Sequence, residues 1–229
     1  MSIKEEEKKN AAKEASLLVK DGQTIGLGTG STVNYLIEAL SKRKENEKFS
    51  IKVVPTSNSS ADYAQKFGIQ LTTLFENPEL DIDIDGADQV DPNLNLIKGL
   101  GGALTREKIV ASASRQFVII IDESKMTEKL GESQVIPVEV IPFSIPTVTR
   151  KLEKLGGKPI LRIVKGNNDP YVTDNSNQIL DVNFGPISNP RELGTKIKMI
   201  PGVVEHGLFI GMANTIYVGM PHGVQRIWK

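Results

Sequence analysis

The order of the predicted elements constrains the fold more than any other feature of the chain. Residues 24–27 are typical of a short buried strand, a glycine loop follows, and apolar side chains recur at helical spacing over 33–40. Residues 51–54 predict a second strand, and 116–121 form a continuous apolar run suited to a strand covered on both faces. Strands alternating with helices predict an α/β fold, a doubly wound, mostly parallel, Rossmann-like sheet.

The pattern changes near Gly131, where prolines surround a strand and glycine-rich loops end. The order from there is strand, helix, strands, helix, strand, which fits a smaller ferredoxin-like α+β domain. Residues 213–218 are expected to return to the main sheet. We therefore predict a Rossmann-like catalytic domain of residues 1–131 plus 207–229 and a ferredoxin-like domain of residues 132–206. The smaller domain's expected strands lie within 135–142 and at 160–164, 171–173, 178–184 and 202–204, and its expected helices are 148–155 and 193–200.

Composition excludes several classes of function. Among 229 residues, 28 Lys and Arg balance 28 Asp and Glu, which argues against nucleic acid or an acidic membrane surface as partner. There is no cysteine, and His206 and His222 are the only imidazoles, so we expect no metal and no disulfide. The charged N-terminus lacks the apolar core of a secretory signal, and no stretch has transmembrane length, which predicts a cytoplasmic location.

The first glycine loop, residues 26–32, resembles a dinucleotide fingerprint but departs from it. Ser31 stands where the third glycine belongs, and no acidic residue follows the strand that ends at Val54. The loop also lacks the Gly-Lys-Ser/Thr ending of a P-loop. Its amides and hydroxyls from Thr29 to Thr32 could hold one phosphate at a helix N-terminus. The alternative is a tight turn that binds nothing.

Residues 81–86 resemble the opening of a calcium loop, with three aspartates and a glycine at matching positions. Pro92 stands where the bidentate glutamate belongs, so we do not expect calcium. Asp85 and Asp88 remain candidates to grip sugar hydroxyls and pass protons. The alternative is a solvated acidic turn.

The segment from Lys98 to Lys108 places a lysine and three glycines directly before a predicted helix. Glycines let backbone N–H groups approach an anion closely, and a helix N-terminus adds positive potential. Glu107 could move a proton while Lys98 and the amides stabilise the oxyanion, which indicates an isomerase. The alternative is an exposed glutamate on an ordinary helix start. Because all three loops follow strands of one predicted sheet, we expect them to converge on one small ligand.

Four motifs together resemble the type A ribose-5-phosphate isomerase family. Weaker likenesses lie at residues 130–131, 137–139, 172–175 and 202–209. Leu100, Gln89 and Ser176 depart from what that family often carries. The four motifs are Gly28-Thr29-Gly30-Ser31-Thr32, Asp85-Gly86-Ala87-Asp88, Lys98 to Lys108, and Asp122-Glu123-Ser124-Lys125.

The resemblance implies a cofactor-free, metal-independent interconversion of ribose 5-phosphate and ribulose 5-phosphate through an enediolate. Glu107 would be the base, Asp85 would help to open the ring, and Lys98 would stabilise the enediolate. The family assembles as homodimers or homotetramers, commonly through the smaller domain. A coenzyme A transferase-like enzyme and a non-catalytic sugar-phosphate sensor remain alternatives. The implied substrate-binding residues are Lys8, Thr29, Gly30, Ser31, Thr32, Asp85, Gly86, Ala87, Asp88, Lys98, Gly99, Leu100, Gly101 and Lys125.

Overall fold

The structure is a computed structural model that describes residues 2–47 and 49–228. The chain divides into two compact units. Unit 1 comprises Met1–Ala87, Arg106–Lys125 and Gly211–Lys229, and unit 2 comprises Asp88–Thr105 and Met126–Ile210. The predicted smaller domain, 132–206, lies wholly within unit 2, which also contains the 88–105 segment. None of the helices within the described residues is both long and apolar enough to cross a bilayer.

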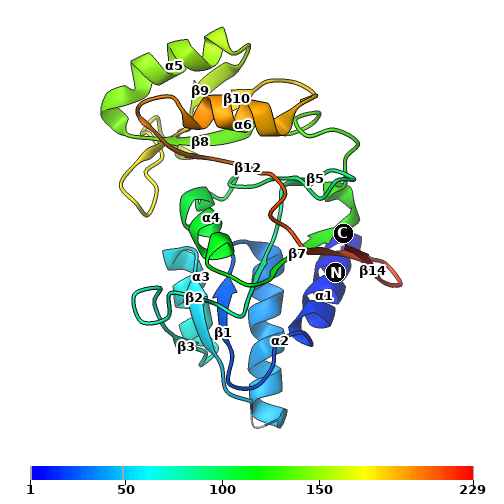
Figure 1. The fold of residues 1–229 in the computed structure, drawn as a ribbon. Helices are drawn as coiled ribbons and strands as arrows, with labels where there is room; N and C mark the ends of the chain where they lie inside the picture. Colours follow the sequence, from blue (N-terminus) through cyan, green and yellow to red (C-terminus); the bar gives the residue numbers. More distant parts are fainter. Residues whose placement is uncertain (1, 48, 229) are drawn as a thin grey trace. The chain divides into compact units, whose positions relative to one another are not determined.

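Unit 1 is built on a seven-stranded sheet in the order β14-β13-β7-β4-β1-β2-β3. Figure 1 labels β1, β2, β3, β7 and β14 of this sheet. Every neighbouring pair is parallel except β13 and β14, which confirms the predicted doubly wound, mostly parallel sheet. The chain runs from β1 outward to β3 and then returns to the other side of β1. Ligands bind at such a reversal, beyond the carboxyl ends of the strands, which here belong to β1 and β4. The strands are β1 (Thr24–Leu27), β2 (Lys52–Pro55), β3 (Gln70–Leu71), β4 (Ile82–Asp85), β7 (Phe117–Asp122), β13 (Thr215–Met220) and β14 (Gly223–Trp228).

The helices of unit 1 are α1 (Ile3–Ser16), α2 (Ser31–Glu47), α3 (Asn58–Lys66) and α4 (Leu104–Ser112), whose first two residues belong to unit 2. A short 3-10 helix, η1 (Glu123–Lys125), follows β7. All six residues of β7 are buried, as its continuous apolar run predicts. On β4 the acidic residues Asp83 and Asp85 are as buried as their apolar neighbours, so this strand carries two acidic side chains into the interior.

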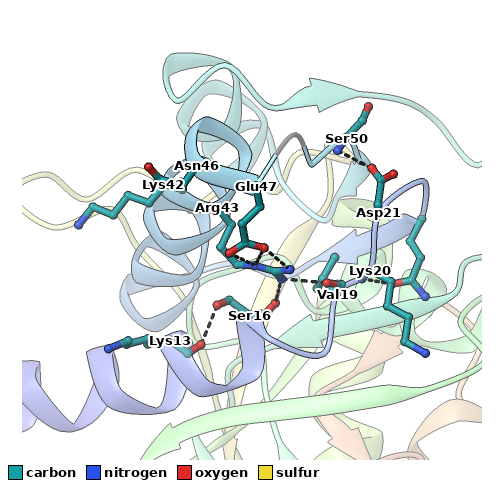
Figure 2. Close-up of polar contacts among 11 residues, drawn as sticks. Lys13, Ser16, Val19, Lys20, Asp21, Lys42, Arg43, Asn46, Glu47 and Ser50 are labelled. Carbon is teal, nitrogen blue, oxygen red and sulfur yellow. Dashed lines mark hydrogen bonds and ion pairs between the residues drawn. The ribbon is translucent and has the colours of Figure 1, made fainter.

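Arg43 on α2 fixes the C-terminal end of α1 (Figure 2). Its Nη1 donates to the carbonyl oxygens of Ser16 at 2.5 Å and Val19 at 2.8 Å, while its Nη2 pairs with Glu47 at 2.9 Å. The guanidinium also lies over the Phe49 ring, 4.3 Å from the centroid. The last carbonyls of a helix lack partners within it, and a cation there also complements the helix dipole. Arg43 therefore holds α1 in place on α2.

Unit 2 contains a four-stranded antiparallel sheet in the order β11-β8-β10-β9. A helix lies between the first two strands along the chain and another between the last two, which confirms the predicted ferredoxin-like arrangement. A 3-10 helix, η2 (Pro142–Ser144), leads into the first of these helices. The elements are β8 (Ile136–Val140), α5 (Ile145–Lys154), β9 (Lys158–Leu161), β10 (Gln178–Asn183), α6 (Pro190–Lys198) and β11 (Val203–His206).

The strand predicted at 171–173 is wrong. Only isolated bridges form there, Ile163 with Pro170 and Val172 with Gln178. The backbone turns at once, because the Thr173 hydroxyl accepts the N–H groups of Asn175 and Asn177, and Ser176 takes a left-handed φ of 62°. Side-chain bonds of this kind compete with strand pairing.

A second, small sheet in unit 2 was not predicted. It has the antiparallel order β12-β6-β5, with β5 (Gln89–Val90), β6 (Leu96–Ile97) and β12 (Leu208–Phe209). Asp88 directly precedes β5 and Lys98 directly follows β6. The Asp88 N–H donates to the carbonyl of Ile97 at 2.8 Å, so this hairpin brings Asp88 beside the start of the second glycine loop.

Candidate active site

Asp85 organises the predicted site residues of unit 1. It ends β4 with a fully buried side chain, and its Oδ1 accepts the N–H groups of Thr29 at 3.1 Å and Gly86 at 2.6 Å. A Cβ on Gly28 would lie 1.9 Å from that same oxygen, so only glycine fits there. The carboxylate at the end of β4 thus fixes the loop after β1.

The loop from Gly28 to Thr32 is fixed further by short hydroxyl groups. Thr29 Oγ1 lies 2.8 Å from Thr56 Oγ1, 2.8 Å from Ser57 Oγ and 3.1 Å from Ser60 Oγ. Gly30 takes a left-handed φ of 119°, which favours glycine, and α2 begins at the next residue. The first N–H groups of a helix have no partner within it and form a ready site for an anion.

Two lysines belong to the same unit. Lys8 on α1 is half-buried, and its Nζ donates to Ser31 Oγ at 2.9 Å. Lys125 ends η1 after β7, which is two strands from β1 in the sheet. A phosphate near the start of α2 would find one lysine already in place beside Ser31.

Glu107 lies in the first turn of α4 and is 3% exposed. The alternative reading, an exposed glutamate on an ordinary helix start, is therefore wrong. Its neighbour Arg106 reaches Asn58 on α3, with Nη1 3.3 Å from Oδ1. A carboxylate on the first turn of a helix is stabilised by the helix dipole, and a buried one is shielded from competing water.

Lys98 is the corresponding buried cation of unit 2, 2% exposed. Its N–H donates to the carbonyl of Gly207 at 2.9 Å, and its Nζ lies over the Phe209 ring, 5.6 Å from the centroid. A Cβ on Gly207 would come within 2.2 Å of the Lys98 carbonyl oxygen, so the close approach of β12 requires glycine. Packing on β12 thus sets the position of Lys98.

The glycine loop after Lys98 is tied to Asp88. Asp88 Oδ2 accepts the N–H of Leu100 at 3.0 Å. Gly99 and Gly102 take left-handed φ values of 97° and 86°, which explains glycine at both positions. Asp88 was predicted as a hydroxyl ligand, and the structure adds that one of its oxygens holds this loop.

Sequence reasoning missed a buried carboxylate in unit 2. Glu139 on β8 is fully buried, and its Oε2 accepts the hydroxyl of Thr105 at 2.5 Å. Its Oε1 accepts Thr173 at 2.9 Å, Asn175 at 3.1 Å and Asn177 at 2.9 Å. Thr105 stands two residues before Glu107 on α4, so Glu139 anchors the start of the helix that carries the predicted base. The resemblance of Pro137-Val138-Glu139 to the family included this glutamate but assigned it no role.

The predicted residues thus fall into two groups. Within the described residues, no cluster of three or more His, Asp or Glu side chains could hold a metal ion. Unit 1 holds Lys8, Thr29, Gly30, Ser31, Thr32, Asp85, Gly86, Ala87, Glu107 and Lys125, and unit 2 holds Asp88, Lys98, Gly99, Leu100 and Gly101.

Comparison with known proteins places the chain in a family. A family model described as ribose 5-phosphate isomerase A (phosphoriboisomerase A) matches residues 52–223. The chain belongs to this family. The ribose-5-phosphate isomerase A of Roseiflexus castenholzii is 47% identical over 218 residues, which cover 95% of this chain and 93% of that protein. The protein of the same name from Thermosynechococcus vestitus is 49% identical over 213 residues, covering 93% and 90%.

Solved structures of the isomerase A family share the fold. Ribose 5-phosphate isomerase A from Methanocaldococcus jannaschii superposes with a TM-score of 0.93 at 44% identity, covering 97% of this chain and 98% of that one. A D-ribose-5-phosphate isomerase in complex with phospho-erythronic acid superposes with a TM-score of 0.96 at 39% identity, covering both chains in full. The α/β fold predicted from the sequence is therefore confirmed by structures of the family.

Proposed function

We propose that this protein interconverts D-ribose 5-phosphate and D-ribulose 5-phosphate, a step of the non-oxidative pentose phosphate pathway. Membership of the isomerase A family supports the substrate. The observation that carries the mechanism is Glu107, a buried carboxylate on the first turn of the helix that begins directly after the Lys98–Gly102 loop.

In the proposed mechanism Glu107 takes the proton from C2 of the open-chain aldose. The electron pair of that C–H bond forms the C1–C2 double bond, and the carbonyl oxygen O1 becomes negatively charged. Glu107 then returns the proton to C1, while the proton of the C2 hydroxyl passes to O1 and C2 becomes the ketone. One carboxylate close to both carbons suffices for both transfers, and no electrons leave the substrate.

Lys98 would stabilise the enediolate together with backbone N–H groups of the Gly99–Gly102 loop other than those of Leu100 and Gly102, which Asp88 and the Gly99 carbonyl bind. Lys98 supports this role because its ammonium is buried, and charges act more strongly where water is excluded. Asp88 would bind a sugar hydroxyl in addition to holding the N–H of Leu100. Asp85 would assist ring opening in addition to fixing the loop after β1.

The phosphate would bind at the start of α2. Gly30, Ser31 and Thr32 would supply backbone N–H groups and hydroxyls, and Lys8 and Lys125 the positive charge. Thr29 contributes differently from its neighbours, because its hydroxyl belongs to the cluster with Thr56, Ser57 and Ser60. Its role is to shape the loop.

The test is to give ribose 5-phosphate to EDTA-treated protein and follow ketose formation by proton NMR. We expect ribulose 5-phosphate to accumulate to equilibrium. Binding without turnover would favour the sugar-phosphate sensor instead. Hydroxylamine trapping of a glutamyl thioester after incubation with an acyl-coenzyme A would favour the transferase.

We also propose that the protein is a homodimer or homotetramer assembled through the smaller domain. Large apolar side chains stand exposed there, with Phe143 96%, Met199 77% and Ile160 71% accessible. Exposed apolar groups in this number are typical of an association surface. Light scattering is expected to give a mass of two or four chains, and a monomer at micromolar concentration would contradict the proposal.

A further inference from the structure

Three consecutive carbonyl groups of the glycine loop accept hydrogen bonds from two side chains of unit 2. Arg162 Nη1 lies 3.3 Å from the Gly99 oxygen and 3.0 Å from the Leu100 oxygen. The Tyr171 hydroxyl lies 3.4 Å from the Gly101 oxygen. Neither residue belongs to a predicted motif of the site.

Arg162 is itself held firmly. Its Nε and Nη2 form two hydrogen bonds with Asp181 on β10, at 2.8 Å and 2.5 Å. The two side chains are 13% and 23% exposed. The guanidinium also lies 5.7 Å from the centroid of the Tyr171 ring. A bidentate, partly buried pair fixes an arginine far better than an exposed ion pair, so Nη1 is a rigid donor.

These bonds fix the orientation of three successive peptide groups. In a trans peptide the N–H points opposite to the carbonyl, so a bound carbonyl also sets the direction of the N–H. In the Gly99–Leu100 peptide the carbonyl is bound by Arg162 and the N–H by Asp88. In the Gly101–Gly102 peptide the carbonyl is bound by Tyr171 and the N–H by the Gly99 carbonyl. In both of these peptides the carbonyl and the N–H are therefore already hydrogen-bonded.

The Leu100–Gly101 peptide lies between them and differs. Arg162 binds its carbonyl, and within the described part of the chain its N–H, which belongs to the exposed Gly101, donates to no backbone carbonyl. This N–H points away from Arg162. Glycine on its C-terminal side leaves the peptide free to rotate, and a rotated peptide would present a carbonyl oxygen instead of a donor.

We propose that Arg162 is a positioning residue that holds the Leu100–Gly101 peptide with the Gly101 N–H directed at the enediolate oxygen. The inference rests on the proposed isomerase function. Without Arg162 the same peptide would turn a partial negative charge toward a developing anion. The loss is therefore expected in the transition state rather than in the binding of the phosphate.

The experiment compares Arg162→Met with Arg150→Met, a matched change at an exposed arginine on α5. For Arg162→Met we expect kcat to fall about 10- to 100-fold, with KM changed less than about threefold. Calorimetry with phospho-erythronic acid, whose two carboxylate oxygens resemble the two oxygens of the enediolate, is expected to show a matching loss of affinity. Inhibition by inorganic phosphate is expected to be unchanged.

A second variant keeps the test decisive if Arg162→Met does not fold. Asp181→Asn keeps the arginine but weakens the pair that holds its guanidinium. We expect the same pattern with a smaller loss of kcat. Arg162→Lys is expected to restore little, because a compact ammonium lacks the planar fork with which the guanidinium binds Asp181 in a bidentate manner while Nη1 reaches the carbonyls. A kcat equal to that of Arg150→Met in a folded variant, or a loss confined to KM, would overturn the proposal. Wild-type protein that binds phospho-erythronic acid but does not isomerise would instead refute the proposed function.

Discussion

The two glycine loops of this protein are each held by an aspartate and differ in their other contacts. The loop of residues 28–32 in unit 1 is fixed by the buried Asp85 carboxylate at the end of the adjacent strand and by short hydroxyl groups around Thr29. The loop of residues 99–102 in unit 2 is held by Asp88 at the Leu100 N–H and by a long side chain, Arg162, from 62 residues further along the chain. The first loop is thus a product of sheet topology, and the second depends on packing between distant segments.

This contrast predicts different kinds of damage. Changes around the unit 1 loop are expected to weaken phosphate binding, which is similar in the ground and transition states. Changes around the unit 2 loop are expected to slow the chemical step, because the charge stabilised there appears only during reaction.

Among changes around the two loops, the largest effect is expected from Lys98→Met. Loss of a buried cation next to the developing enediolate should lower kcat about 10²- to 10³-fold, while inhibition by inorganic phosphate stays unchanged. The apolar replacement suits a side chain that is 2% exposed and packs on Phe209. Steady-state kinetics beside Lys129→Met, a change at an exposed lysine, measures the effect. A loss seen only in KM would place Lys98 with the phosphate loop instead.

A smaller effect on the same step is expected from Thr105→Val. The change removes the donor to Glu139 without changing the shape of the side chain, so the start of α4 loses an anchor two residues before Glu107. A hydrogen bond to a buried charge contributes about 1.5–3 kcal/mol. We expect a lower Tm and a kcat reduced about tenfold. Thr147→Val on α5 is the exposed control, and an unchanged kcat with a lower Tm would limit Glu139 to stability.

Lys8→Met tests the loop of residues 28–32 in the same way. Its ammonium donates to Ser31 at the start of α2, so its loss should raise KM for ribose 5-phosphate about 3- to 10-fold with little change in kcat. Lys4→Met on the same helix is the control, since Lys4 is exposed. Should kcat fall while KM stays constant, the assignment of this loop to the phosphate would be wrong.

The smallest effect concerns the N-terminus of α1, which carries Lys8. Ser2 and Glu5 form a capping box, and the backbone hydrogen bond from Ser2 holds the pKa of Glu5 below its usual value of 4.5. A lowered pKa adds stability above the unfolded value, and this is lost as pH falls through the folded value. Glu5→Gln is therefore expected to lower Tm slightly at pH 7 and not at pH 3. Glu6→Gln, in the same turn, should change Tm with a weaker dependence on pH. An equal pH dependence in the two variants would show that the capping box does not cause the effect.

The sequence predicted the parts of the fold that depend on local pattern. The apolar run of β7 and the glycine loop between β1 and α2 identified the doubly wound sheet, and the order of elements identified the ferredoxin-like unit. The small sheet of β5, β6 and β12 escaped, because strands of two residues show no periodicity. Arg162 and Glu139 escaped as site residues because their partners lie far away in the sequence, and no spacing rule connects them. The predicted strand at 171–173 failed because side chains bind the backbone there.

The central claim is that the Glu107 carboxylate carries the proton between C2 and C1. The direct measurement is to run wild-type protein and Glu107→Gln in D2O with ribose 5-phosphate and follow the C1 and C2 hydrogens by proton NMR. Because Glu107 returns the proton that it takes from C2, we expect the wild type to form ketose whose C1 carries hydrogen from C2, with deuterium entering C1 only when the Glu107 proton exchanges with solvent before its return. Glu107→Gln, with phosphate binding retained, is expected to lose about two to four powers of ten in both isomerisation and exchange at C2. Isomerisation by the variant at a near-normal rate, or undiminished exchange at C2, would contradict the account.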